Sequence, residues 1–245
     1  MNNKITITLD RPTDRFNNFR RLRHLLEILV AFLPILVLGI IGTSLGTDTL
    51  LGGMIVTFGY ILSILVATVF IKVRGSSWRE IGLARPPSWK RTILAGIGVL
   101  GALIVMNIAV QVIAVNLPGT EVAPIDQSRF NPLQGNLMIF LLFVLLSWTT
   151  IAFGEEMFYR AFLITQLEDV FPASKLGTGL VLLVSSLVFG LVHLVEGPLG
   201  IINTFLIGAI LGLVYLRSGR NLWITIIAHG LANSIRFYFI FLGVS

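Results

Sequence analysis

Three short groups of polar residues lie within stretches of the sequence that are otherwise apolar. They are Glu155-Glu156-x-x-x-Arg160, Phe189-x-x-x-His193 and His229-x-x-x-Asn233. An ionisable side chain in the hydrocarbon of a membrane costs several kcal/mol, so such residues are rare there and generally serve a function. The chain has 3 His, and two of them fall in these groups. The grouping therefore predicts a site with its own chemistry.

The first group combines two carboxylates with one guanidinium. Residues four apart share a helix face, so Glu156 and Arg160 are predicted to pair and to neutralise each other's charge. Glu155 lies about 100° around the helix from its neighbour and has no local cation. A carboxylate placed in this way is suited to accept a proton as a general base. We therefore predict that Glu155 activates a water molecule, with Glu156 and Arg160 as a supporting pair.

The other two groups supply histidine and amide side chains. A His can share the water with Glu155, and His and Asn donors can stabilise the oxyanion of a tetrahedral intermediate, which together predicts peptide-bond hydrolysis. We expect Phe189 to wall the site and exclude lipid. A carboxylate with two His also matches the ligand count of a catalytic zinc, so Glu155, His193 and His229 are candidate metal ligands. No His-Glu-x-x-His motif is present, so metal-activated and glutamate-activated water both stay open.

The composition indicates the membrane elements that must position these groups. Of the 245 residues, 55% are hydrophobic and 12% are charged, against roughly 25% charged in soluble domains. Continuous apolar runs, rather than alternating ones, favour helices. We predict an all-α, polytopic transmembrane bundle of about seven helices, with six to eight as the range, in a single domain over 1–245. The runs are 25–46, 50–71, 92–117, 136–166, 176–194, 199–217 and 221–242.

The distribution of Lys and Arg predicts the orientation. Basic residues crowd the leader 1–24 and the segment 72–91, whereas the turn near Asp48 has none. Cytosolic loops carry such an excess, so the N-terminus is predicted to be cytosolic and the C-terminus outside. The net charge of +6 is thereby explained by topology and membrane lipids rather than by nucleic acid, which we do not expect as a partner. The absence of Cys excludes a disulfide, a cysteine nucleophile and a thiolate metal site.

This topology also predicts the depth of each group. Counted along the expected helices from the cytosolic side, Glu155 and Glu156 lie about 15 Å in and His229 about 12 Å in. His193 lies about 20–25 Å in, which is too far by about 10 Å, or two turns. We expect the three groups to converge near mid-membrane, nearer the cytosolic side, although this count leaves His193 deeper than the other two.

Taken in order, the three groups resemble the signature of the CAAX prenyl protease and bacteriocin-processing family (CPBP, or Abi) of intramembrane proteases. The resemblance covers about the last 90 residues, within a motif-bearing half at 136–243. It implies an intramembrane endopeptidase in which Glu155 and His193 activate water, while His229 and Asn233 stabilise the oxyanion. Members of the family have been classed both as metalloproteases and as glutamate proteases, so a divalent metal such as zinc stays open.

The resemblance also bears on substrate and origin. It implies a peptide or lipid-modified protein substrate that approaches from the cytosolic side. Eukaryotic relatives remove the last three residues of prenylated proteins, and bacterial relatives are linked to peptide maturation and bacteriocin immunity. The short chain and minimal loops favour a multi-pass protein of a bacterial cell membrane.

Two other classes of function are compatible with the same residues. The first is a non-catalytic membrane immunity or scaffold protein, in which the polar groups only hold helices together. The second is a proton-coupled transporter, because intramembrane Glu, His and Arg also form proton relays. The sequence shows no inverted repeat, which counts against the transporter.

Overall fold

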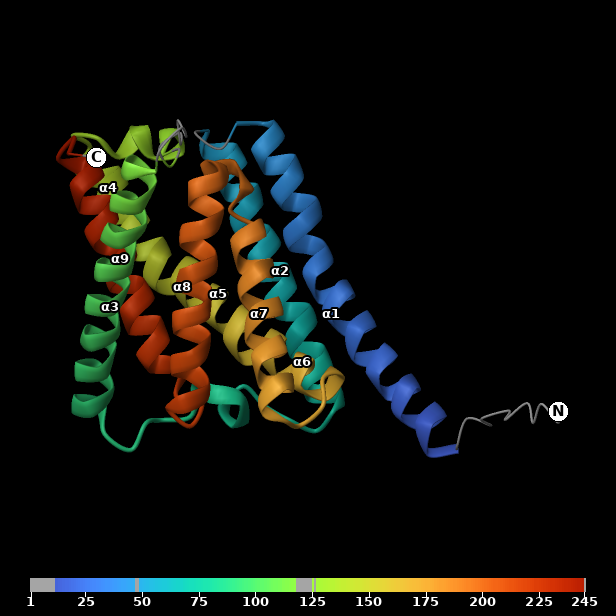
Figure 1. Cartoon of the computed structure of the whole chain (residues 1–245). Helices are drawn as coiled ribbons and strands as arrows, with labels where there is room; N and C mark the ends of the chain where they lie inside the picture. The colour runs from blue at the N-terminus through green and yellow to red at the C-terminus, as the bar shows by residue number, and fades with distance from the viewer. Residues whose placement is uncertain (1–11, 47–48, 118–124, 126, 245) are drawn as a thin grey trace, which may run out of the picture.

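The computed structural model describes residues 12–46, 49–117, 125 and 127–244, and all regular structure in this part of the chain is helical. Figure 1 shows the helices packed as one bundle. Their bounds are α1 (Pro12–Ser44), α2 (Leu50–Val73), α3 (Trp89–Asn116), α4 (Leu137–Leu146), α5 (Ala152–Glu155), α6 (Ile164–Val170), α7 (Lys175–Leu191), α8 (Gly197–Arg217) and α9 (Leu222–Phe241). Shorter segments are the π-helical η1 (Arg79–Leu83), η3 (Ser147–Ile151) and η4 (Glu156–Leu163), and the 3-10 helices η2 (Ser128–Leu133) and η5 (Leu194–Glu196).

The described helices include 6 that are long and apolar enough to cross a membrane, and α7 is a shorter apolar helix. The spans are Asn18–Ser44, Leu51–Val73, Trp89–Asn116, Leu137–Val170, Leu194–Arg217 and Leu222–Phe241. The prediction of an all-α polytopic bundle is confirmed, and each predicted run corresponds to one of these elements.

The predicted boundaries differ from the structure mainly in the first helix. α1 begins at Pro12, so much of the predicted leader is helical, and residues 1–11 lie outside the described residues. The polar side chains of this extension contact other helices: Arg20 reaches Asp169 at 2.5 Å, and His24 reaches Gln166 at 2.8 Å. These contacts explain why the helix continues through a stretch whose composition resembled a leader.

Several helices begin at a side chain that caps their first turn. An oxygen of Ser, Thr or Asn accepts a hydrogen bond from a backbone N–H that has no partner within the helix. This occurs at the start of α2, α3, α4, α7 and α9, through Thr49, Ser88, Asn136, Ser174 and Asn221. Local sequence therefore sets these boundaries independently of the hydrophobic pattern.

One continuous helical segment, Leu137–Val170, runs obliquely through the bundle, with α4 and α6 at its two ends and α5 near the centre of Figure 1. At about 1.5 Å per residue it is too long for a perpendicular crossing, which accounts for its tilt. All eight residues of η4 are buried. We call this segment the central helix, and its two π-helical parts are of a kind often found at functional sites.

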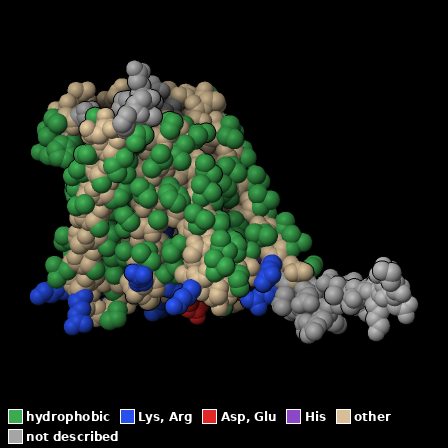
Figure 2. All heavy atoms as spheres, viewed as in Figure 1, with side chains coloured by type: hydrophobic (Ala, Val, Ile, Leu, Met, Phe, Trp, Pro, Cys, Tyr) green, Lys and Arg blue, Asp and Glu red, His purple; other side chains and the backbone are tan. Residues whose placement is uncertain are grey.

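The surface separates charge from apolar side chains. Figure 2 shows hydrophobic residues over the side of the bundle and Lys and Arg along one edge. This edge, which we call the basic rim, contains the start of α1, the α2–α3 loop, the α6–α7 turn and the α8–α9 turn. The helices α1, α3, α7 and α9 therefore all begin at the same side of the bundle, as expected for a chain that crosses back and forth.

Close packing of α7 against α8 positions an aromatic residue of the second group. A Cβ at Gly208 would lie 3.2 Å from Cδ1 of Phe189 and 3.1 Å from Cα of Ser186. Small residues let membrane helices approach closely. Gly208 thus provides the space in which the Phe189 ring is held.

Candidate active site

Glu156 lies at the centre of the candidate site and is fully buried. Its Oε1 is 3.0 Å from Nη1 of Arg160 and accepts a hydrogen bond of 2.9 Å from Nδ1 of His229. The ion pair joins residues four apart within η4, as the spacing predicted, whereas the contact with His229 joins the central helix to α9. Glu156 therefore holds a residue of the third group as well as its own cation.

The contact with Glu156 fixes the orientation of the His229 ring. A carboxylate oxygen only accepts, so the proton of this hydrogen bond is on Nδ1. The second ring nitrogen, Nε2, is left to face Glu155. Nε2 lies 3.8 Å from Oε2 of Glu155, and both side chains are buried. This distance is too long for a direct hydrogen bond but within reach of one bridging polar group.

Phe189 connects the remaining histidine to this cluster. Its ring lies 4.3 Å below the guanidinium carbon of Arg160, a favourable cation–π geometry. The same ring is 5.0 Å from the ring of His193 and 6.2 Å from that of His229. Nδ1 of His193 donates to the carbonyl of Phe189 at 2.8 Å, which places its proton on Nδ1.

The depth of His193 differs from that inferred from the sequence. His193 follows the end of α7 at Leu191, about 27 Å along the chain from the basic rim if counted as helix. The central helix continues to Val170 rather than to 166, so Glu155 is about 22 Å from its rim end along that helix. The difference in depth between Glu155 and His193, measured along the helices, is therefore about 5 Å rather than 10 Å, and the Phe189 ring lies between His193 and the cluster.

Asn233 lies one turn beyond His229 and is held by a residue that sequence reasoning missed. Its Nδ2 donates a 3.1 Å hydrogen bond to Oγ of Ser147, which is fully buried at the start of η3. The only signal for Ser147 was a small hydroxyl within an apolar run. Such a residue is common in membrane helices and carries no motif.

A second missed feature is the tyrosine layer beside Phe189. Tyr159 is buried, its ring lies 5.0 Å from that of Phe189, and its hydroxyl is 3.5 Å from that of Tyr60. These contacts bury Tyr159 beside the site and join the central helix to α2.

Several buried polar atoms of this site have no hydrogen-bond partner among the described residues. Oε2 of Glu156 and both Nη atoms of Arg160 are buried and have no hydrogen-bond partner among them. Nη1 of Arg160 lies close to Glu156 as an ion pair, but without hydrogen-bond geometry. A buried donor without an acceptor costs about 1–3 kcal/mol. The site is thus less fully satisfied than an ordinary buried ion pair.

The arrangement of the candidate ligand side chains does not match the zinc site that the sequence left open. Within the described residues, no three His, Cys, Asp or Glu side chains gather as a set of metal ligands. Glu155 approaches His229, but Nδ1 of that ring is already bonded to Glu156. The three candidate ligands Glu155, His193 and His229 therefore do not fit a three-ligand zinc centre, and the metalloprotease alternative receives no support.

Of the predicted site residues, Glu155, Glu156, Arg160 and His229 form one connected cluster, in which Arg160 and His229 pair with Glu156 and His229 also approaches Glu155. His193 joins them through Phe189, and Asn233 is adjacent along α9. All three sequence groups therefore meet within one part of the bundle, on the central helix, the end of α7 and α9.

Comparison with known proteins supports the family resemblance. Residues 137–235 match the family described as Type II CAAX prenyl endopeptidase Rce1-like. CAAX prenyl protease 2 of Saccharomyces cerevisiae is 34% identical over 101 residues, which is 34% of this chain and 32% of that relative. The chain thus spans about a third of the length of the curated relative it matches. No solved structure shows a significant match.

Proposed function

From the family match over residues 137–235, which contains all three polar groups, we propose that this chain is an intramembrane endopeptidase. Its substrate would be a lipid-modified protein, as for the CAAX prenyl endopeptidases that the family is named after. The hydrolysed bond would lie near the lipid-bearing residue, because the site is buried within the bundle.

The observation that carries this proposal is the pairing of Glu155 with an oriented His229. A general base and an oxyanion donor must lie within a few ångströms of each other, because the attacking oxygen and the oxyanion are bonded to the same carbon. Oε2 of Glu155 and Nε2 of His229 are 3.8 Å apart, and Glu156 fixes the ring that carries Nε2.

The reaction follows from these positions. Glu155 takes a proton from water as the oxygen attacks the carbonyl carbon, and the carbonyl oxygen becomes the oxyanion. When the tetrahedral intermediate collapses, the carbon–nitrogen bond breaks and the proton passes from Glu155 to the leaving amine. The products are a carboxylic acid and an amine, so water is the only co-reactant.

Stabilisation of the oxyanion is assigned to α9. His229 would donate from Nδ1 to Glu156 and, once Nε2 also carries a proton, from Nε2 to the oxyanion. Asn233, held by Ser147 at 3.1 Å, supplies a second donor on the same side of α9. The role in water activation that the resemblance gives to His193 stays a prediction.

The proposed access route is the basic rim. Loops rich in Lys and Arg remain in the cytosol, so the rim in Figure 2 would face that side and a substrate would enter from the inner leaflet. Glycosylation or cysteine-accessibility mapping of residues placed in the α2–α3 loop and in the 242–244 tail tests this orientation. Labelling of the α2–α3 loop from the outside would reverse it.

Cleavage by the full chain in proteoliposomes tests the proposed reaction. The substrates are two otherwise identical peptides, with and without a prenylated cysteine near the C-terminus. We expect cleavage of the prenylated peptide, and a loss of about 10²–10⁴-fold in Glu155→Gln with unchanged thermal unfolding. The matched control is Glu80→Gln, which changes an exposed carboxylate of the α2–α3 loop and should keep full turnover.

Other outcomes would favour the rival functions. Equal turnover by Glu155→Gln and the unmodified chain would refute glutamate activation. If the unmodified chain cleaves neither peptide and Glu155→Gln only lowers the stability, a scaffold protein would be favoured. Solute uptake driven by a pH gradient into the same liposomes would favour a transporter. Dialysis against a chelator should leave turnover unchanged, whereas a loss restored by zinc would replace the glutamate mechanism with the metal alternative.

A further inference from the structure

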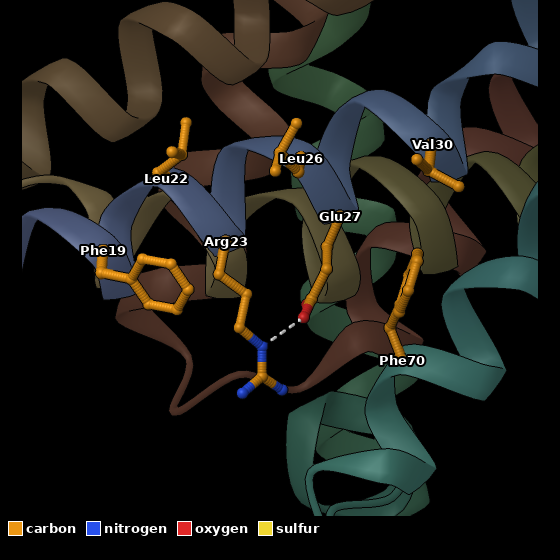
Figure 3. Close-up of a pocket in the computed structure, with 7 residues that line it drawn as sticks. All are labelled: Phe19, Leu22, Arg23, Leu26, Glu27, Val30 and Phe70. Atoms are coloured by element: carbon orange, nitrogen blue, oxygen red, sulfur yellow. Dashed lines mark hydrogen bonds and ion pairs between the residues drawn. The ribbon is translucent and has the colours of Figure 1, made fainter.

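A groove of about 330 Å³ lies on the side of α1, away from the candidate active site. Figure 3 shows it in close-up, with Phe19 and Phe70 at opposite ends and Arg23 between them. Its lining consists of five apolar and two charged residues: Phe19, Leu22, Leu26, Val30, Phe70, Arg23 and Glu27. The proposed peptidase reaction uses none of these residues.

The apolar wall is a stripe on α1 that no other described helix covers. Phe19, Leu22, Leu26 and Val30 are spaced by three or four residues, so they share one face of the helix. They are between 47% and 74% exposed. Figure 1 shows α1 leaning away from the rest of the bundle toward its N-terminal end, which leaves this face open. In a membrane such a stripe is covered by a hydrocarbon chain.

The polar side of the groove carries excess positive charge. The carboxylate of Glu27 accepts from Nε of Arg23 at 2.9 Å, and it also binds Arg74. Arg74 and Arg20 also pair with Asp169, so three guanidinium groups share two carboxylates. The Arg23 side chain is 53% exposed, against 9% for Glu27 and 20% for Arg74, so the surplus charge lies at the mouth of the groove.

Figure 3 shows the two terminal nitrogens of Arg23 directed away from the Glu27 carboxylate. The groove lies within the span Asn18–Ser44, near the end that joins the basic rim. Basic pockets between membrane helices at this level bind anionic lipid headgroups, and a guanidinium binds a phosphate in a bidentate manner. The apolar stripe thus suits the acyl chain of a phospholipid, and Arg23 suits its phosphate.

We propose that this groove binds an anionic phospholipid of the adjacent leaflet, with one acyl chain along Phe19, Leu22, Leu26 and Val30 and its phosphate on Arg23. A soluble anion would use only the charge, and a zwitterionic lipid would bring a cationic group to Arg23. The site is independent of the peptidase proposal, and its test therefore needs no substrate.

The lipid also fills the space between α1 and the rest of the bundle near Phe70 on α2. A ligand that binds the folded state raises its stability in proportion to the logarithm of its concentration over Kd. Phosphatidylglycerol should therefore stabilise the protein more than phosphatidylcholine with the same acyl chains.

Thermal unfolding of the full chain in a neutral detergent measures this difference, with each lipid added at equal mole fraction. We expect a higher Tm with phosphatidylglycerol, and loss of most of that difference in Arg23→Gln. The matched control is Arg21→Gln, which removes an exposed charge two residues away that does not line the groove. It should keep the difference.

A second variant and a second anion keep the test decisive if Arg23→Gln folds poorly. Leu26→Trp fills the groove at a half-exposed position and should also remove the preference for phosphatidylglycerol while retaining the fold. Inorganic phosphate should leave the Tm unchanged. Equal effects of the two lipids, equal losses in Arg21→Gln and Arg23→Gln, or full stabilisation by inorganic phosphate would each overturn the proposal.

Discussion

Two buried polar clusters in this bundle contain similar residues but are bonded differently. The site cluster comprises Glu155, Glu156, Arg160 and His229, and the rim cluster comprises His24, Glu27, Arg74 and Gln166. Each has one His, one Arg and at least one carboxylate in a mainly apolar surrounding.

The members of the rim cluster are extensively hydrogen-bonded to one another. Gln166 donates to Glu27 at 3.1 Å and accepts from Arg74 at 2.5 Å, and Arg74 approaches Nδ1 of His24 at 2.7 Å. Among the described residues, the buried polar atoms without a hydrogen bond include Oε2 of Glu156 and two nitrogens of Arg160 but none from the rim cluster.

The contrast indicates how to separate structural from chemical polar clusters inside a membrane protein. The rim cluster ties α1 and α2 to α6 and satisfies its own donors and acceptors. The site cluster keeps donors unused and holds two groups at 3.8 Å, a separation that serves a reacting molecule better than it serves stability. Variants in the rim cluster should therefore change stability alone, whereas variants in the site cluster should lower turnover whether or not they also lower stability.

The largest effect is expected when the central cation of the site cluster is removed. Arg160→Met leaves the fully buried carboxylate of Glu156 without its cation, which should lower the free energy of unfolding by about 3–5 kcal/mol. The double variant Glu156→Gln/Arg160→Met should recover most of this stability but not turnover, because His229 loses its carboxylate. Thermal unfolding and peptide cleavage measure the two effects. A double variant as unstable as the single one would contradict the ion-pair assignment.

A smaller loss, limited to turnover, is expected from the oxyanion side. Asn233→Ala should lower kcat by about 10²–10³-fold, the usual cost of removing one oxyanion donor. Ser147→Ala should cost less, because Asn233 remains but is no longer held. Steady-state cleavage and Tm are measured together. If Ser147→Ala reduces kcat more than Asn233→Ala does, Asn233 is not the donor.

The rim cluster should show the opposite pattern. Arg74→Met removes one of the two cations on Glu27 and should lower the free energy of unfolding by about 2 kcal/mol, while kcat of the folded fraction changes less than twofold. The matched control is Arg79→Met in the neighbouring η1 segment, with little expected change. A fall in kcat at unchanged Tm would show that the two clusters are not separable.

The smallest effect is expected at an exposed carboxylate, the reference for both clusters. The hydrogen bond from Ser76 is the main cause that lowers the pKa of Glu80 below its ordinary value of 4.5. A lowered pKa stabilises the fold above the unfolded-state pKa, and this contribution is lost as the pH falls through the folded-state value. Ser76→Ala should therefore lower Tm slightly at pH 7 and not at pH 2. If the Tm difference between Ser76→Ala and the unmodified chain grew as the pH fell, the hydrogen bond would not be lowering the pKa of Glu80.

Contacts within one helix were accessible from the sequence, and contacts between helices were not. The spacing of Glu156 and Arg160 predicted their pairing, and the apolar runs predicted the helices. That Glu156 also holds His229 depends on the packing of α9 against the central helix, which no spacing reveals. The resemblance supplied the grouping of the three motifs but not the bonds between them.

The rim cluster was invisible to sequence reasoning for a related reason. The four residues of the rim cluster form no motif; His24 ends the predicted leader 1–24, and Glu27 lies in the first predicted apolar run, 25–46. His193 shows the other difficulty. Its depth depends on where two helices end, and an error of one turn moves a residue by about 5 Å.

The π-helical segment η4 lies between Glu155 and Gln166, and it makes the number of residues between them a constraint in its own right. A π-helical turn corresponds to one residue inserted into an α-helix. Deleting one residue there would rotate Gln166 by about 100° relative to Glu155, even if every remaining side chain were kept. The site cluster and the rim cluster could not then both form. Among homologous chains, substitutions in this segment at positions other than Glu156 and Arg160 should therefore be far better tolerated than single-residue insertions or deletions.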